Sequence, residues 1–142
     1  MIVLGSDHAG FAMKNGLARH LQERGYEVRD VGCFNEESCD YPDFARPACE
    51  AVVNGEAEKA ILVCGTGIGM SMAANKIPGI RAAAVSEEFS AQATREHNDA
   101  NVLCLGARVL DQEKAEKLLD IFMDTPFSNG ANHIRRISKL EQ

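Results

Sequence analysis

Short apolar runs alternate with helical segments along the chain, and this alternation restricts the possible folds more than any other feature. Each of five runs of strand length is followed by a segment with helical periodicity, which predicts a parallel sheet covered by helices on both faces. Because crossovers between parallel strands are right-handed, few topologies remain. The strands are expected at 1–6, 26–31, 60–64, 80–85 and 101–105, and the helices at 9–24, 42–54, 68–76, 87–96 and 111–123.

Residues that cap or interrupt helices refine these expectations. Ser86 and Asp111 suit the N-caps of the fourth and fifth helices, because their side chains can accept hydrogen bonds from free N–H groups. Pro47 lies within the second helical pattern, so it either begins the true helix or kinks it. After Asn129 and Gly130, the basic segment HIRRISKLEQ at 133–142 predicts an additional C-terminal helix, which packs on the sheet or on a partner subunit.

Length and composition indicate one acidic domain whose partners are neither nucleic acid nor membrane. The 142 residues show no linker, repeat or low-complexity tract, so residues 1–142 are expected to form a single domain. The net charge of −6 argues against nucleic acid and anionic membranes, which select basic surfaces. No signal peptide and no apolar run of membrane-spanning length are visible, which favours a cytoplasmic protein.

The five cysteines are expected to be free thiols. Their odd number, without a secretory signal, is typical of a reducing cytosol. No CxxC pair is present, which argues against a zinc site, and the sequence predicts no metal ligands. Cys49 and Cys104 lie in apolar patterns and are expected to be small core residues.

Polar residues follow the predicted strands at their carboxyl ends. Ligands of open α/β sheets bind outside this edge. We therefore expect an acid, a histidine, a thiol, a hydroxyl and an arginine to share one edge of the sheet. The segments are Ser6–His8, Asp40–Pro42, Cys64–Gly67, Ser86–Glu87 and Gly106–Arg108.

The segment VCGTGIGMS at 63–71 has two interpretations. It has neither the lysine of a P-loop nor the GxGxxG spacing of a dinucleotide site. In one interpretation it is a tight strand-to-helix turn without a ligand. In the other, the glycines let backbone N–H groups approach an anion, and Cys64 beside a helix start tends toward the thiolate. Such a thiolate can attack a carbonyl, or remove a proton beside one while the donors hold the oxyanion.

Other polar residues also have both a structural and a functional interpretation. Asp7 and His8 form either a solvated loop pair or a site that orients a hydroxyl and binds an anion. His97 is either a helix C-cap or a proton donor and acceptor near neutral pH. Arg135 and Arg136 are either the solvated face of a helix or a phosphate clamp.

Six segments together carry a resemblance that covers almost the whole chain. They are GSDHAG (5–10), DYPDF (40–44), VCGTGIGMSMAANK (63–76), GIRAA (79–83), REHNDAN (95–101) and LGARV (105–109). In this order they resemble the ribose-5-phosphate isomerase type B family, which includes galactose-6-phosphate and allose-6-phosphate isomerases. The resemblance implies a Rossmann-like three-layer α/β/α sandwich and aldose–ketose isomerisation without a cofactor. The CGTGIG and HNDAN segments together are highly specific.

The resemblance also implies a role for each matching residue. Cys64 resembles the base that moves a proton between C1 and C2 of the sugar. Thr66 and His97 resemble residues that assist ring opening, and Asp7 resembles one that handles hydroxyl protons. The matching binding residues are Gly65 and Gly67 for the cis-enediolate, Tyr41, Gly69, Ser71 and Asn98 for the sugar, and His8, Arg108 and Arg136 for the phosphate.

A shared site and a particular sugar are implied as well. In the family each site lies between two subunits of a dimer or a dimer of dimers, with His97, Asn98 and Arg108 coming from the partner. Members with cysteine in the glycine loop resemble the ribose and allose enzymes. Cys64 therefore favours ribose 5-phosphate over galactose 6-phosphate as the substrate.

One position departs from the family's pattern and keeps alternatives open. Asn132 stands where the first of two C-terminal arginines is expected, and asparagine has no charge and no bidentate fork. Phosphate binding should be weaker, unless Arg135 compensates. An alternative is therefore an isomerase of allose 6-phosphate or of an unphosphorylated aldose. A nucleotide-binding regulatory module is the alternative of another class, although the glycine spacing fits no dinucleotide fingerprint.

Overall fold

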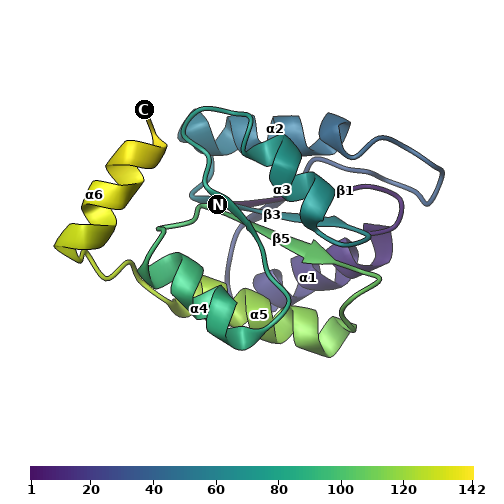
Figure 1. The fold of residues 1–142 in the computed structure, drawn as a ribbon. Coiled ribbons are helices and arrows are strands. Elements are labelled where there is room, and N and C mark those ends of the chain that lie inside the picture. The colour runs from purple at the N-terminus through teal and green to yellow at the C-terminus, as the bar shows by residue number, and fades with distance from the viewer.

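A five-stranded parallel sheet forms the centre of the computed structural model, which describes all 142 residues (Figure 1). The strand order is β2-β1-β3-β5-β4, and every neighbouring pair is parallel. The three central strands are almost wholly apolar, as expected for strands covered on both faces. The strands are β1 (Ile2–Ser6), β2 (Val28–Asp30), β3 (Lys59–Cys64), β4 (Ala82–Ala84) and β5 (Val102–Gly106).

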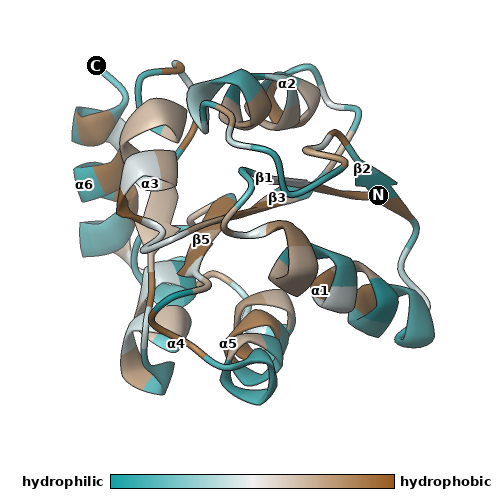
Figure 2. Ribbon diagram, turned by 90° about the vertical axis from the view of Figure 1, so that its right-hand side faces the viewer, coloured by the Kyte–Doolittle hydropathy of each residue, from teal (hydrophilic) through white to brown (hydrophobic).

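Helices cover both faces of this sheet, with α2 and α3 on one face and α1, α4 and α5 on the other (Figure 1). Successive side chains of a strand point to opposite faces, so Ile2 and Leu4 pack with one set of helices and Val3 with the other. Figure 2 shows the apolar strands enclosed between the helices. The helices are α1 (Phe11–Glu23), α2 (Pro42–Val53), α3 (Ile68–Ala74), α4 (Glu88–Glu96), α5 (Gln112–Asp124) and α6 (Ala131–Leu140). None has the length and apolar character needed to cross a membrane.

The predicted architecture of five parallel strands with helices on both faces is confirmed. Asp111 caps α5 as predicted, because its carboxylate accepts a hydrogen bond from the N–H of Lys114 at 2.8 Å. The prediction of Ser86 as the cap of α4 is wrong. Glu87 is the cap: its backbone is extended, and its carboxylate accepts a hydrogen bond from the N–H of Ser90 at 2.9 Å.

The structure also decides two predictions about the face of the sheet that α2 and α3 cover. Pro47 lies inside α2 and does not begin it, because Pro42 occupies the first turn. Cys49 and Cys104 are fully buried between the sheet and α2 and α3, which confirms them as core residues. Burial raises the pKa of the Cys49 thiol to about 12, so this cysteine stays protonated at neutral pH.

The C-terminal helix α6 stands apart from the layers. It begins at Ala131, two residues before the predicted segment, and none of its residues is buried. In Figure 1 the arrowhead of β5 points away from α6, so the helix lies beyond the amino ends of the strands. Helix α6 therefore does not pack on the sheet of its own chain.

Candidate active site

Cys64 ends β3 at the carboxyl edge of the sheet, where the chain turns into α3. The strand register pairs it with Gly106, the last residue of β5. Its side chain is buried, and its Sγ accepts a hydrogen bond from the N–H of Gly67 at 3.2 Å. The sulfur is therefore held at a fixed position against the first turn of the helix.

The turn between β3 and α3 presents a cluster of backbone donors. Gly67 has a φ of 82° and would place a Cβ only 3.1 Å from the carbonyl oxygen of Cys104, so any side chain there would be strained. The N–H of Ile68 donates to Oγ1 of Thr66 at 3.2 Å. Donors at the start of a helix attract negative charge. Four N–H groups of this turn and of the first turn of α3 donate to no acceptor within the chain, those of Gly65, Thr66, Gly69 and Met70.

Tyr41 joins this turn from the segment before α2. Its ring lies against Gly69, where a Cβ would be 2.9 Å from the Tyr41 Cζ. Any larger residue at that position would displace the ring. On the same turn, Oγ of Ser71 donates to the carbonyl oxygen of Ile68 at 2.7 Å. The predicted Tyr41 and Ser71 therefore lie at the same turn as Cys64.

Asp7 and His8 extend the same edge from the end of β1. The Asp7 side chain is buried, and its Oδ1 accepts a hydrogen bond from the N–H of Gly10 at 3.1 Å, while Oδ2 has no partner within the chain. Nδ1 of His8 accepts a hydrogen bond from the N–H of Cys39 at 3.2 Å. A neutral imidazole held in this way carries its proton on Nε2 and can donate it to an anion.

Arg108 reaches the Cys64 turn within one chain. The N–H groups of Ala107 and Arg108 donate to the carbonyl oxygens of Cys64 and Gly65 at 2.8 and 2.9 Å. The guanidinium lies against Gly65, where a Cβ would be 3.3 Å from Nη1, and it forms no ion pair. The resemblance implies that Arg108 comes from a partner subunit, whereas here backbone hydrogen bonds hold it beside Cys64 of its own chain.

His97 and Asn98 lie at the amino edge of the sheet, where the strands begin, in the turn between α4 and β5. The five residues of β5 separate the two edges by about 13 Å, given the rise of a strand. The His97 ring stacks on His133 of α6, with ring centroids 4.4 Å apart and an interplanar angle of 13°. Arg136 lies about one turn further along α6 than His133.

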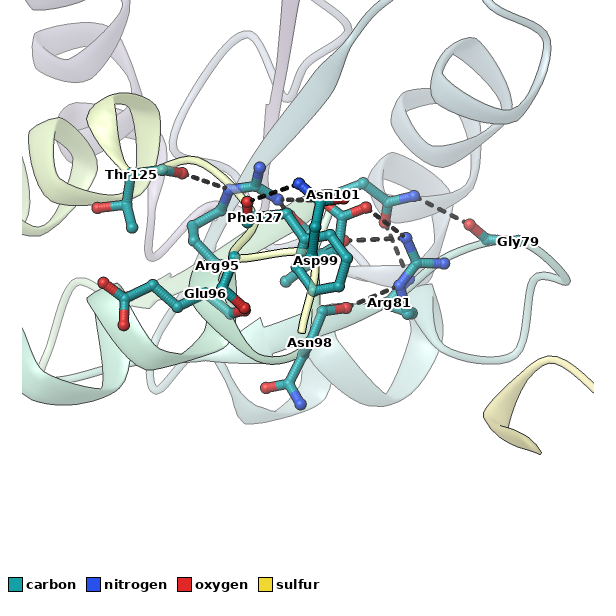
Figure 3. Close-up of polar contacts among 12 residues, drawn as sticks. Gly79, Arg81, Arg95, Glu96, Asn98, Asp99, Asn101, Thr125 and Phe127 are labelled. Carbon is teal, nitrogen blue, oxygen red and sulfur yellow. Dashed lines mark hydrogen bonds and ion pairs between the residues drawn. The ribbon is translucent and has the colours of Figure 1, made fainter. Parts of the chain in front are cut away.

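Two arginines hold the turn that carries His97 and Asn98 (Figure 3). Nη1 of Arg95 contacts Oδ1 of Asp99 at 2.8 Å and the carbonyl oxygen of Ala100 at 2.7 Å. Arg81 donates to the carbonyl oxygens of Asn98 and Asp99, both at 2.9 Å. Asp99 has a φ of 46°, which non-glycine residues rarely adopt, and these contacts hold it there. Figure 3 shows the Asn98 amide pointing away from the network.

The Arg136 guanidinium brings positive charge close to the place where α6 meets this turn, beside His97 and His133. Burial lowers the pKa of His133, and the nearby His97 and Arg136 lower it further. Neither Arg135 nor Arg136 forms an ion pair with a carboxylate. In a chain with a net charge of −6, unpaired basic groups at one place favour an anionic ligand.

The structure thus divides the predicted site residues between two edges of one chain. It brings one group together at the carboxyl edge and places the other at the amino edge. The first group is Asp7, His8, Tyr41, Cys64, Gly65, Thr66, Gly67, Gly69, Ser71 and Arg108, and the second is His97, Asn98 and Arg136.

Sequence reasoning missed two residues that hold these groups. Cys39 positions His8, and its only signal was its place just before the DYPDF segment. Arg81 lies in the GIRAA segment, but a single arginine before an edge strand does not reveal which carbonyl oxygens it contacts. No three His, Cys, Asp or Glu side chains gather where they could hold a metal ion.

Residues 2–140 match the Ribose/Galactose Isomerase family. Ribose-5-phosphate isomerase B of Escherichia coli (strain K12) is 44% identical, and the alignment covers 99% of this chain and 96% of that protein. A putative sugar phosphate isomerase, YwlF, of Bacillus subtilis (strain 168) is 45% identical over 98% of this chain and 93% of its own.

Solved structures of similar chains have the same fold. Ribose-5-phosphate isomerase B of Clostridium thermocellum superimposes with a TM-score of 0.97 at 46% identity, covering 99% of this chain and 94% of its own. Ribose-5-phosphate isomerase B of Mycoplasma genitalium, solved with bound ribulose-5-phosphate, gives a TM-score of 0.93 at 39% identity, with coverages of 99% and 93%.

Proposed function

The chain belongs to the ribose/galactose isomerase family, and from this premise we propose that it interconverts ribose 5-phosphate and ribulose 5-phosphate through a cis-enediolate. Cys64 is the base in this proposal, and residues 1–142 form one isomerase domain without a cofactor. Relatives named ribose-5-phosphate isomerase B match the chain over almost its full length at about 44–46% identity, which supports this sugar phosphate.

One observation carries the mechanism: a thiol and unpaired backbone donors share one strand-to-helix turn. Moving a proton between C1 and C2 requires a base beside the carbon-bound hydrogen. It also develops negative charge on the neighbouring carbonyl oxygen, which must be stabilised. The Cys64 sulfur is fixed 3.2 Å from the Gly67 nitrogen, and four further N–H groups of the turn are unpaired. The turn can supply both the base and the oxyanion donors.

The remaining roles come from the family resemblance, and the positions of several side chains support them. Thr66 accepts from Ile68 through Oγ1 and keeps its own hydroxyl proton available for the ring oxygen during ring opening, together with His97. Asp7 has one carboxylate oxygen without a partner, which can exchange a hydroxyl proton. Tyr41, Ser71 and Asn98 contact the sugar hydroxyls.

The phosphate clamp consists of His8, Arg108 and Arg136 in this proposal. Arg108 and Arg136 are exposed and form no ion pair, so a phosphate does not have to displace a carboxylate. The hydrogen bond from Cys39 leaves Nε2 of His8 as a donor. Arginine suits this task because its planar fork matches phosphate oxygens.

Two copies of the chain must contribute to each such site. Cys64 and Arg108 lie at one edge of the sheet, and His97, Asn98 and Arg136 lie beyond the other edge. A single chain cannot bring them to one sugar, because β5 separates them. A homodimer, alone or within a dimer of dimers, can pair the Cys64 edge of one protomer with the His97 edge of its partner.

The decisive test is a substrate panel. Purified protein is assayed for ketose formation from ribose 5-phosphate, allose 6-phosphate, free ribose and free allose. We expect the largest kcat/KM for ribose 5-phosphate. A larger value for a free sugar would contradict the proposal. Thermal stabilisation by nucleotides but not by ribose 5-phosphate would favour the regulatory module instead.

Asn132 supports a second candidate, an isomerase of another sugar that depends less on phosphate. The residue is exposed in the first turn of α6, on the helix that carries Arg136. Its amide can donate a hydrogen bond but adds no charge to the clamp. Arg135, three residues further on, lies near the same face of the helix and can partly replace the missing cation.

Replacing Asn132 with arginine should strengthen binding of phosphorylated sugars. A charged hydrogen bond contributes about 1.5–3 kcal/mol, so KM for ribose 5-phosphate should fall about tenfold or more in Asn132→Arg. Turnover of free ribose should not change. Asn132→Gln, which keeps the amide, is the matched control. If KM for the phosphate is unchanged and wild type prefers a free sugar, the second candidate replaces the first.

A further inference from the structure

Arg81 lies just before β4 and connects two segments that carry proposed substrate-binding residues. Its Nε donates to the carbonyl oxygen of Asn98 and its Nη2 to that of Asp99, both at 2.9 Å (Figure 3). Its Nη1 contacts Oε1 of Glu141 at 2.7 Å, at the end of α6. One guanidinium therefore bridges the turn after α4 and the C-terminal helix.

Neighbouring groups fix the position of Arg81. Its N–H donates to Oδ1 of Asn101 at 2.9 Å, and Nδ2 of Asn101 donates to the carbonyl oxygen of Gly79 at 2.9 Å. Its side chain is only 20% exposed. Because a guanidinium is planar and permanently charged, it is a rigid link between the groups that it contacts.

Helix α6 has few other attachments. None of its residues is buried, and a cleft of about 630 Å³ lies between its last residues and the edge strand β4. Among hydrogen bonds, ion pairs and ring stacks, two contacts join this helix to the sheet layers: the Arg81–Glu141 ion pair and the stack of His133 on His97. The ring stack ends on His97, and the ion pair ends on Arg81, which holds the turn that contains His97.

We propose that Arg81 is a positioning residue, which couples the His97–Asn98 turn to α6 and thereby sets where Arg136 meets the substrate phosphate. The inference rests on the proposed function for its substrate. Arg81 itself does not touch the sugar. It acts through the carbonyl oxygens of the turn and through Glu141, so its removal affects phosphate binding from a distance.

The test is Glu141→Gln, which breaks the link to α6 and leaves the contacts of Arg81 with Asn98 and Asp99 in place. The variant alters an exposed residue near the C-terminus, so folding should be unaffected. We expect KM for ribose 5-phosphate to rise about fivefold, the most that a partly exposed ion pair sustains, with kcat unchanged. Glu56→Gln, which breaks the exposed Arg29–Glu56 pair elsewhere, is the matched control and should change neither.

A double-mutant cycle identifies Arg81 as the residue through which Glu141 acts. Arg81→Gln should raise KM and lower kcat, because the His97 turn also loses two donors. In that background Glu141→Gln should have no further effect on KM. An equal additional increase would show that Glu141 acts through another group, which would overturn the proposal.

Amide hydrogen exchange tests the coupling without using activity. Residues 131–140 should exchange faster in Glu141→Gln than in wild type, while those of α4 should not change. If wild type does not act on ribose 5-phosphate, the proposed function fails, and the exchange rates still decide the coupling. If wild type is active and both KM and exchange in Glu141→Gln equal those of wild type, the role of Arg81 is wrong.

Discussion

The Cys64→Ala protein should fold like wild type and lose essentially all isomerase activity. Removing a positioned base lowers the rate by on the order of 10²–10⁴ or more. The fold should be retained, because the change deletes one sulfur atom at the end of a strand whose residues 60–63 are fully buried. The measurement is kcat for ketose formation from ribose 5-phosphate, beside the thermal unfolding midpoint of both proteins.

Two matched variants separate the chemistry of the thiol from its packing. Cys49→Ala makes the same change in the same buried cluster, but on α2 and away from the turn, so it should keep its kcat. Cys64→Ser keeps the size of the side chain and an acceptor for the Gly67 N–H. Its hydroxyl does not ionise near neutral pH as a thiol can, so this variant should be inactive. A Cys64→Ala enzyme with near-normal kcat would remove the thiol from the mechanism.

Alkylation gives an independent view of the same residue. A thiol reagent should inactivate the enzyme through Cys64, and ribose 5-phosphate should protect it. Burial raises the pKa values of Cys49 and Cys104, so these two cysteines should stay unmodified under the same conditions. Mass spectrometry of the peptides identifies the modified residue. Inactivation without modification of Cys64 would be evidence against its role.

His97→Asn should slow turnover of the cyclic sugar far more than turnover of the open-chain form. If His97 exchanges a proton during ring opening, a substrate supplied as the open aldehyde avoids the step that needs it. Loss of a general acid–base group costs about 10²–10⁴ in that step. His20→Asn is the matched control, because His20 pairs with Glu116 and Asp120 between α1 and α5. Equal losses on both substrate forms would favour a purely structural role.

Mixing two inactive variants should restore activity if the site is shared. A hybrid of Cys64→Ala and His97→Asn chains has one doubly altered site and one intact site. With random exchange in equal mixtures, half the dimers are hybrids, so about a quarter of wild-type activity is expected. Mass spectrometry confirms that subunits have exchanged. Absence of rescue after confirmed exchange would show that each chain holds a complete site.

Much of the fold could be predicted because local patterns and global fold agree. The apolar runs that form β1, β3 and β5 are buried on both faces. A short apolar run of this length can be recognised as a buried strand from the sequence alone. Strand order could not be predicted, because the pattern of one strand does not state which strand lies beside it. The cap of α4 was misplaced because Ser86 and Glu87 both accept hydrogen bonds, and the backbone decides between them.

The site was only partly predictable for a related reason. Residues that follow strands were expected at one edge, and Asp7, Cys64 and Arg108 do lie there. His97 precedes a strand, so local pattern alone places it at the other edge, and only the resemblance connected it with Cys64. Arg81 was missed because its role depends on backbone carbonyl oxygens of distant segments. Every residue type has the same backbone carbonyl, so the sequence does not reveal which ones an arginine contacts.

The length of β5 has a further consequence if its two ends belong to two different sites. No working site then exists in a lone chain, and the number of sites depends on how many chains have associated. Below the dissociation constant of the dimer, the rate should rise with the square of the protein concentration rather than in proportion to it. In a cell, expression level would then control flux more steeply than for an enzyme with a self-contained site, and a substrate that spans both halves would itself promote assembly.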